Sequence, residues 1–419
     1  MKKIFIIIAI VIAMILSLPL STMAGVDPDC DLVFGITSSG EIHEVNPNDG
    51  TYTKVGEIYN CINTHASGPN GLAYHPQTNR IYYTEYPDQN GDNETDFYYI
   101  DLGTGVEVYV GTLPGEIADA DIYQGKYYYI AGGQITGFTD DLYEVALDVA
   151  TGNVTSITKV ADISGNVHAY GFWGDIAISA DGLIYGVGDC KVSGHNDFDL
   201  FTFNLDGSGF VIHSQVSMPL QLAFGCDGTL YGHEFGTGHF YEIDIENWVV
   251  KPDILSTGEG YCDLASRPCV GSIEILKLDY ITRQKLGGAV FSVSPDPYDY
   301  DGELIVADNT PPDSDPTWGV VLLENVSCGT YIVTERQAPE GYIKLTGVTI
   351  KEVSHNLTTT FTFLNRQSDG GEKDGEPPAV GIIVMPMDKA GLLLPWAVLI
   401  GLLVLATGVG LVVRRRMTR

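Results

Sequence analysis

Three polar residues continue the apolar faces of three predicted strands, and their types could do chemistry together. They are Lys277, Glu335 and Asn365. The apolar residues two and four positions before them are Ile273 and Ile275, Tyr331 and Val333, and Phe361 and Phe363. Side chains alternate along a strand, so each polar residue shares the face of its apolar partners. If these faces form a core, an amine, a carboxyl and a carboxamide are buried together and must satisfy one another, because an unpaired buried charge costs several kcal/mol.

The segments around these residues resemble a known family. They are Gly271–Asp279, Leu286–Phe291, Gly329–Glu335, Ala338–Tyr342 and Phe361–Asn365. The region 270–367 is similar to the SpaA-like, or collagen-adhesin B-type (Cna-B), repeat of pilins and surface adhesins. The resemblance implies an immunoglobulin-like, prealbumin-like β-sandwich. A Pro- and Asp-rich stretch, Asp308–Gly319, replaces the family's short turn, and we expect it to loosen that loop while leaving the motif positions unchanged.

The resemblance also implies a role for each polar residue. Burial would leave the Lys277 amine neutral and nucleophilic. A protonated Glu335 would polarise the carboxamide oxygen of Asn365 and shuttle protons. Lys277 would then attack Asn365, ammonia would leave, and an intramolecular isopeptide bond would join the first strand to the last. The alternative is a buried hydrogen-bonded cluster with no covalent bond.

An acidic stretch at residues 88–96 offers oxygen ligands at every second position. The residues are Asp88, Asn90, Asp92, Glu94 and Asp96. Hard cations such as calcium need oxygen ligands, although this spacing does not match an EF-hand. The alternatives are a calcium site and a solvated acidic loop, and we expect no other cofactor.

The region 30–268 predicts an all-β domain built from a degenerate repeat. Short strands with tyrosines are separated by Gly, Asn and Asp turns, and four strands recur about every 40–55 residues, the period of a β-propeller blade. Leu32–Gly35 looks like part of a unit whose first strand is missing, and Asp263–Ala265 looks like an isolated first strand. Joining the two ends gives about five blades and removes exposed edges. The alternative is an open array of β-sandwiches.

Both ends of the chain predict contact with a membrane. Residues 1–24 have the basic, apolar and small-residue parts of a signal peptide, with an uncleaved anchor as the alternative. Residues 391–413 are apolar and long enough for one transmembrane helix, and the basic tail 414–419 places that end in the cytoplasm. Residues 368–390 predict a linker. The chain lacks a Leu-Pro-x-Thr-Gly sortase signal before the apolar run, which favours a retained helix as the tether.

Charge and cysteines restrict the function further. The net charge of −32 argues against a nucleic-acid partner. Seven cysteines leave at least one unpaired, and their pairing is open. No nucleophile-elbow, phosphate-loop or zinc-protease motif is present.

We therefore expect a single-pass cell-surface display or adhesion protein. The sandwich would serve as a stalk, and the propeller as a head for an extracellular protein or glycan. We expect no catalytic turnover beyond the single intramolecular reaction. The alternative is an extracellular propeller enzyme, a glycan hydrolase or lyase.

Overall fold

The computed structural model describes most of the region between the two predicted membrane segments. The described residues are 28–58, 69–85, 94–132, 140–166, 174–188, 190, 198–234, 237–252, 254–298 and 302–368. Apart from one short 3-10 turn, η1 (Pro28–Asp31), every element in them is a strand, which confirms the all-β prediction. No helix of this part could cross a membrane. The predicted signal peptide, the linker beyond Ser368, the transmembrane helix 391–413 and the tail 414–419 lie outside the described residues.

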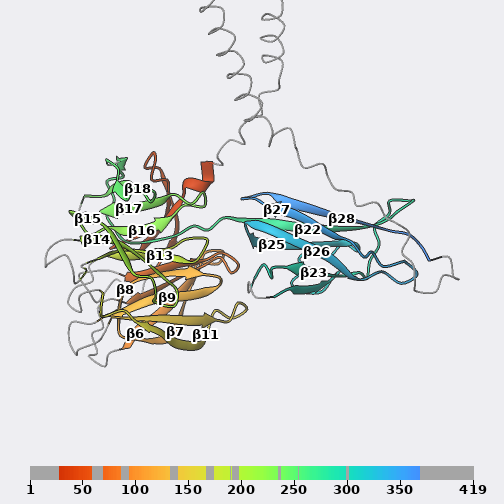
Figure 1. Cartoon of the computed structure of the whole chain (residues 1–419), viewed down its shortest axis with the longest axis horizontal. Coiled ribbons are helices and arrows are strands. Elements are labelled where there is room, and N and C mark those ends of the chain that lie inside the picture. The colour runs from red at the N-terminus through yellow and green to blue at the C-terminus, as the bar shows by residue number, and fades with distance from the viewer. Residues whose placement is uncertain are drawn as a thin grey trace, which may run out of the picture. The chain divides into compact units, whose positions relative to one another are not determined.

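The first region forms five antiparallel sheets (Figure 1). In hydrogen-bonding order they are β21 (Tyr261–Ala265), β1 (Val33–Thr37), β2 (Glu41–Val45) and β3 (Tyr52–Glu57); β4 (Pro69–His75), β5 (Arg80–Glu85), β6 (Glu94–Asp101) and β7 (Val106–Pro114); β8 (Glu116–Tyr123), β9 (Lys126–Gly132), β10 (Asp141–Leu147) and β11 (Val154–Asp162); β12 (Asp175–Ile178), β13 (Leu183–Gly188), β14 (Phe198–Asn204) and β15 (Val211–Val216); and β16 (Gln221–Phe224), β17 (Leu230–Glu234), β18 (His239–Asp244) and β19 (Val249–Val250), with β20 (Leu255–Ser256) also paired to β18.

The five sheets close into a ring, which we call the sheet ring. The first strand of each sheet contacts the first strand of the next, in the order β21, β4, β8, β12, β16 and back to β21. One sheet combines both ends of the region, because β21 pairs with β1, with Leu264 opposite Gly35. This is the joined unit that the sequence predicts, and the arrangement is propeller-like.

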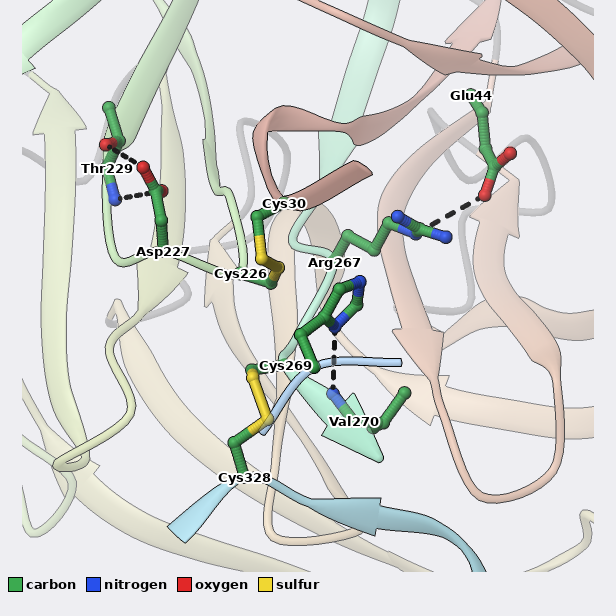
Figure 2. The surroundings of a disulfide bond; sticks show 10 residues. Cys30, Glu44, Cys226, Asp227, Thr229, Arg267, Cys269, Val270 and Cys328 are labelled. Atoms are coloured by element: carbon green, nitrogen blue, oxygen red, sulfur yellow. Dashed lines mark hydrogen bonds and ion pairs between the residues drawn. A yellow bond between two sulfur atoms is a disulfide. The ribbon is translucent and has the colours of Figure 1, made fainter. Parts of the chain in front are cut away.

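Two further contacts fasten this closure. A disulfide joins Cys30 to Cys226, which lies in the turn after β16, and Arg267 forms an ion pair with Glu44 on β2 (Figure 2). The Arg267 N–H also donates to the Phe224 carbonyl at 3.0 Å. The chain therefore leaves the sheet ring anchored to two of its sheets.

The tyrosine-rich runs follow from this architecture. A strand inside a stacked ring is covered on both faces, so consecutive residues enter different cores. Tyr82 packs in one core with Tyr127, whereas the next residue, Tyr83, packs in the neighbouring core with Ile81 and Phe34. Adjacent aromatic residues are therefore buried together in one strand, rather than alternating with polar ones.

The second region is a two-layer β-sandwich (Figure 1). One sheet has the order β25 (Val320–Ser327), β22 (Val270–Asp279) and β28 (Thr358–Asn365). The other has the order β24 (Leu304–Ala307), β23 (Val290–Ser294), β26 (Gly329–Gln337) and β27 (Val348–Val353). The first and last strands, β22 and β28, are parallel neighbours. A disulfide between Cys269 and Cys328 ties the start of β22 to the end of β25 (Figure 2).

Candidate functional site

The alternation predicted for the three sandwich strands is present. In β22, β26 and β28, every second residue is buried, and the buried series end in Lys277, Glu335 and Asn365. Their exposed fractions are 2%, 0% and 0%. Two charged or chargeable groups and an amide are therefore held out of water at one end of the core.

The two layers bring these side chains together. Lys277 pairs with Phe363 across the parallel strands, and Asn365 lies two residues further along β28, on the same face. Glu335 comes from β26 in the facing sheet. The amine and the carboxamide thus approach from adjacent strands, and the carboxyl approaches from the opposite layer.

Every polar atom of the cluster has a partner within it. The Lys277 Nζ donates to the Asn365 Oδ1 and lies 2.5 Å from the Glu335 Oε1. The Asn365 Nδ2 donates to both Glu335 oxygens, at 2.9 and 3.1 Å. The buried polar groups therefore satisfy one another, as the sequence argument requires.

The surroundings favour a neutral amine. The Phe363 ring lies with its centroid 5.8 Å from the Lys277 Nζ and packs against Phe291. Burial lowers the pKa of Lys277, and the adjacent Glu335 opposes that shift. A neutral lysine beside a carboxamide can act as a nucleophile toward its carbonyl carbon.

Glu335 contacts both nitrogen atoms of the cluster, Lys277 Nζ and Asn365 Nδ2. A carboxyl between these nitrogens is placed to take a proton from the attacking amine and deliver it to the departing one. This position suits the proton transfer that the sequence assigns to Glu335.

The Asp308–Gly319 stretch is held by hydrogen bonds and reaches the backbone of Lys277. The Asp308 carboxylate accepts from the N–H groups of Gly288 and Gly319, at 3.0 and 2.9 Å. The Gly319 carbonyl in turn accepts from the Lys277 N–H at 2.9 Å. The buried Asp308 carboxylate at the start of this stretch therefore fixes the backbone of Gly319 at its end, and Gly319 in turn pairs with the backbone of Lys277.

The Ala338–Tyr342 segment covers the same end of the sandwich. The Tyr342 hydroxyl donates to the Asp279 Oδ2 at 3.1 Å, and Tyr342 forms a β-bridge with Gln367. Asp279 ends the Gly271–Asp279 motif, and the sequence alone assigns it no role. Its position two residues after Lys277 places it where this segment closes over the end of β22.

The structure describes two of the five predicted calcium ligands. Asp88, Asn90 and Asp92 lie outside the described residues. Glu94 and Asp96 lie on β6, where they accept hydrogen bonds from Thr112 at 2.6 Å and Tyr98 at 3.4 Å. These two acids belong to a strand, and calcium binding by the five residues stays a prediction.

Comparison with known proteins supplies a family for one region. Solved structures similar to this chain include the nidogen/laminin complex (12% identity, 56% of this chain and 96% of that chain, TM-score 0.36). Others are the calcium-binding protein regucalcin from Agrobacterium tumefaciens (15%, 44% and 57%, 0.29) and the Bacillus anthracis TIE protein (13%, 71% and 39%, 0.21). At these TM-scores the likenesses carry no functional assignment, and no curated protein sequence matches the chain. Residues 271–367 match the family described as the SpaA prealbumin-like fold domain, which confirms the predicted fold of the sandwich.

Proposed function

We propose that the chain is a membrane-anchored cell-surface display or adhesion protein. Its sandwich is a stalk stabilised by its own isopeptide bond, and its sheet ring is a five-bladed propeller that binds an extracellular protein or glycan. The observation that supports the stalk is the buried meeting of Lys277, Glu335 and Asn365 from three strands.

The reaction needs no cofactor. The Lys277 Nζ attacks the Asn365 side-chain carbonyl carbon, a new C–N bond forms, and the bond from that carbon to Nδ2 breaks. Glu335 accepts a proton from Nζ and passes one to Nδ2, which leaves as ammonia, so the carboxyl ends as it began. The packed strands hold the reactants in place, and this replaces a bimolecular encounter with an intramolecular one.

The Lys277–Asn365 isopeptide bond would strengthen the sandwich against tension along the chain. It joins the first and last strands, which are the points where the rest of the chain enters and leaves the sandwich. Tension along the chain would otherwise have to be resisted by hydrogen bonds alone.

Mass spectrometry of the secreted ectodomain ending at Ser368 tests the cross-link. We expect an intact mass lower by one ammonia, and a branched proteolytic peptide that contains Lys277 and Asn365. Glu335→Gln should restore the full mass, whereas Lys344→Met, which removes an exposed lysine of the same module, should retain the deficit. An unmodified wild-type mass would leave the site as a hydrogen-bonded cluster.

The role of the sheet ring needs a separate measurement. Binding of the same ectodomain to arrays of glycans and extracellular proteins should depend on the sheet ring and be unaffected by Glu335→Gln. Binding that is lost in this variant would place the binding site on the sandwich instead.

A further inference from the structure

The hydrogen-bond ladder between β22 and β25 changes partners at Lys277. Its register runs to Leu276 opposite Val320, and the next pair along the two strands is Lys277 with Gly319. A closely bonded antiparallel pair exchanges two hydrogen bonds, one from each N–H to the other residue's carbonyl. The Lys277 N–H does donate to the Gly319 carbonyl, at 2.9 Å, whereas the Gly319 N–H donates to the Asp308 Oδ2, also at 2.9 Å. A side-chain carboxylate therefore replaces one backbone partner at this pair.

The carbonyl of Lys277 is held by a different segment. The Leu286 N–H donates to it at 2.9 Å. Two residues further along the chain, the Gly288 N–H donates to the same Asp308 Oδ2, at 3.0 Å. One carboxylate oxygen thus binds both of the segments that hold the backbone of Lys277. We call Asp308, Leu286, Gly288 and Gly319 the lysine clamp.

The two segments of the lysine clamp are also packed tightly against each other. Asp308 directly follows β24 and is only 8% exposed. Gly319 has a φ of +79°, and a Cβ added to it would lie 2.7 Å from the Leu286 nitrogen, so only glycine fits there. The Trp318 ring covers Gly287 so closely that a Cβ on Gly287 would lie 2.1 Å from it. The sequence therefore leaves room for this close approach with two glycines.

The position of the Lys277 backbone matters because the side chain that it carries is long. A lysine amine sits on a flexible four-carbon stem, so it is well placed only where the backbone and the core confine that stem. Reacting atoms must come within about 3–3.5 Å, and a misplacement of about 1 Å can slow a reaction roughly a hundredfold. On one side β22 is fixed by its parallel neighbour β28, which carries Asn365. The lysine clamp fixes the backbone N–H and carbonyl of Lys277 on the other side.

We propose that Asp308 is a positioning residue for the cross-linking reaction. Its carboxylate holds the lysine clamp closed, and this fixes the backbone of Lys277 so that the amine meets the Asn365 carboxamide. Asp308 acts through the backbone, and Glu335 remains the group that transfers protons. The inference rests on the proposed isopeptide bond, and it adds to the reaction a residue from the Pro- and Asp-rich stretch.

The rate of cross-linking in the full chain tests this proposal. The chain is made by cell-free synthesis under oxidising conditions, and samples are quenched in acid and denaturant after increasing times. Mass spectrometry of the digested samples gives the ratio of the branched Lys277–Asn365 peptide to the two linear peptides. The rate is taken from molecules whose Cys269–Cys328 disulfide has formed, so that chains that have not folded are left out.

Asp308→Ala should slow the reaction roughly tenfold or more, because it releases both segments that hold the Lys277 backbone. Asp308→Asn keeps an oxygen that can accept both glycine N–H groups, and it should react at close to the wild-type rate.

Asp313→Ala is the matched control. The Asp313 carboxylate accepts three backbone N–H groups of this stretch and of β25, those of Asn309, Asp315 and Leu322, at 2.8, 3.0 and 2.9 Å. Its loss removes as many hydrogen bonds from the same part of the sandwich but leaves the lysine clamp intact. We expect this variant to cross-link at the wild-type rate.

Gly319→Ala opens the lysine clamp without altering the carboxylate, because the added Cβ pushes against the Leu286 backbone. It should slow the reaction as well, which provides a second test if Asp308→Ala does not fold. In both slow variants the pH dependence of the rate should keep its wild-type shape, since the lysine clamp acts on the position of the amine and not on its proton affinity.

Three results would overturn the proposal. The first is a wild-type rate of cross-linking in Asp308→Ala and Gly319→Ala. The second is an Asp313→Ala chain slowed as much as Asp308→Ala, which would show a general loss of stability. The third is an Asp308→Asn chain as slow as Asp308→Ala, which would assign the effect to charge. A wild type that never loses ammonia would instead refute the proposed isopeptide bond, and this inference with it.

Discussion

Removal of the proposed Lys277–Asn365 bond, without leaving a buried charge, should lower the melting temperature of the sandwich by roughly 15–30 °C. The double variant Lys277→Met/Glu335→Gln serves this purpose, because it leaves a neutral pair of amides in the core. A single substitution would confound the loss of the bond with an unpaired buried group.

The magnitude follows from the loop that the bond closes. Lys277 and Asn365 are 88 residues apart, which corresponds to about 4.6 kcal/mol of chain entropy removed from the unfolded state. The Cys269–Cys328 disulfide shortens this loop, since the path from Lys277 through the disulfide to Asn365 is about 45 residues long. The remaining stabilisation is still about 4 kcal/mol, because loop entropy depends only logarithmically on length.

Differential scanning calorimetry of the secreted ectodomain under oxidising conditions provides the assay. The transition of the sandwich should move in the double variant, and the transition of the sheet ring should stay in place. Lys344→Met should leave both transitions unchanged. A wild type that has lost ammonia but melts within about 3 °C of the double variant would refute the chain-entropy argument.

The other predictions concern both regions. Under tension in single-molecule pulling, the cross-linked sandwich should extend by roughly 100 Å less than the double variant, because its loaded path through both covalent links is about 29 residues shorter. In the sheet ring, burial raises the pKa of Asp263 to about 8, above the value of 3.8 in an unfolded chain, so the folded state holds a proton that the unfolded state releases. Chemical denaturation should therefore show stability falling as pH rises from about 4 to 8. Gly186→Ala should destabilise the sheet ring by roughly 1–3 kcal/mol, since a Cβ there would collide with the Phe201 ring, whereas Gly165→Ala, with open space around it, should be close to neutral in the same titration.

The sandwich site was predictable because strand alternation is a strict rule. A polar residue that continues an apolar series must either be buried or end the strand, and Lys277, Glu335 and Asn365 are all buried. What alternation does not supply is the identity of the contacting atoms. The placement of Glu335 between two nitrogens depends on how the two sheets face each other, and no strand pattern states this.

For the buried aspartates of the sheet ring, the sequence contained a signal but not the contacts that explain it. Asp121, Asp175 and Asp263 recur at the first position of a repeat, so a signal for a shared role was present. The repeat does not supply their donors, because the N–H groups of Ile178, Leu222 and Leu72 come from the next inner strand of the sheet ring. Oxygen spacing in the acidic stretch 88–96 was a weaker signal, since it does not distinguish a loop from a strand, and Glu94 and Asp96 lie on β6.

The disulfide and the proposed isopeptide bond of the sandwich connect the strands of the same sheet at its two ends. The chain enters at the start of β22 and leaves at the end of its parallel neighbour β28, so tension shears these two strands along their length. The Cys269–Cys328 disulfide ties β22 to β25 at the entry end, and the Lys277–Asn365 bond ties β22 to β28 at the exit end. With both in place, all three strands of the sheet are joined covalently, and only the short stretch of β22 between Cys269 and Lys277 bears load without a bypass. A link placed near the middle of β28 would leave its last residues free to peel, so the position of Asn365, the final residue of that strand, is the one that a load-bearing module requires.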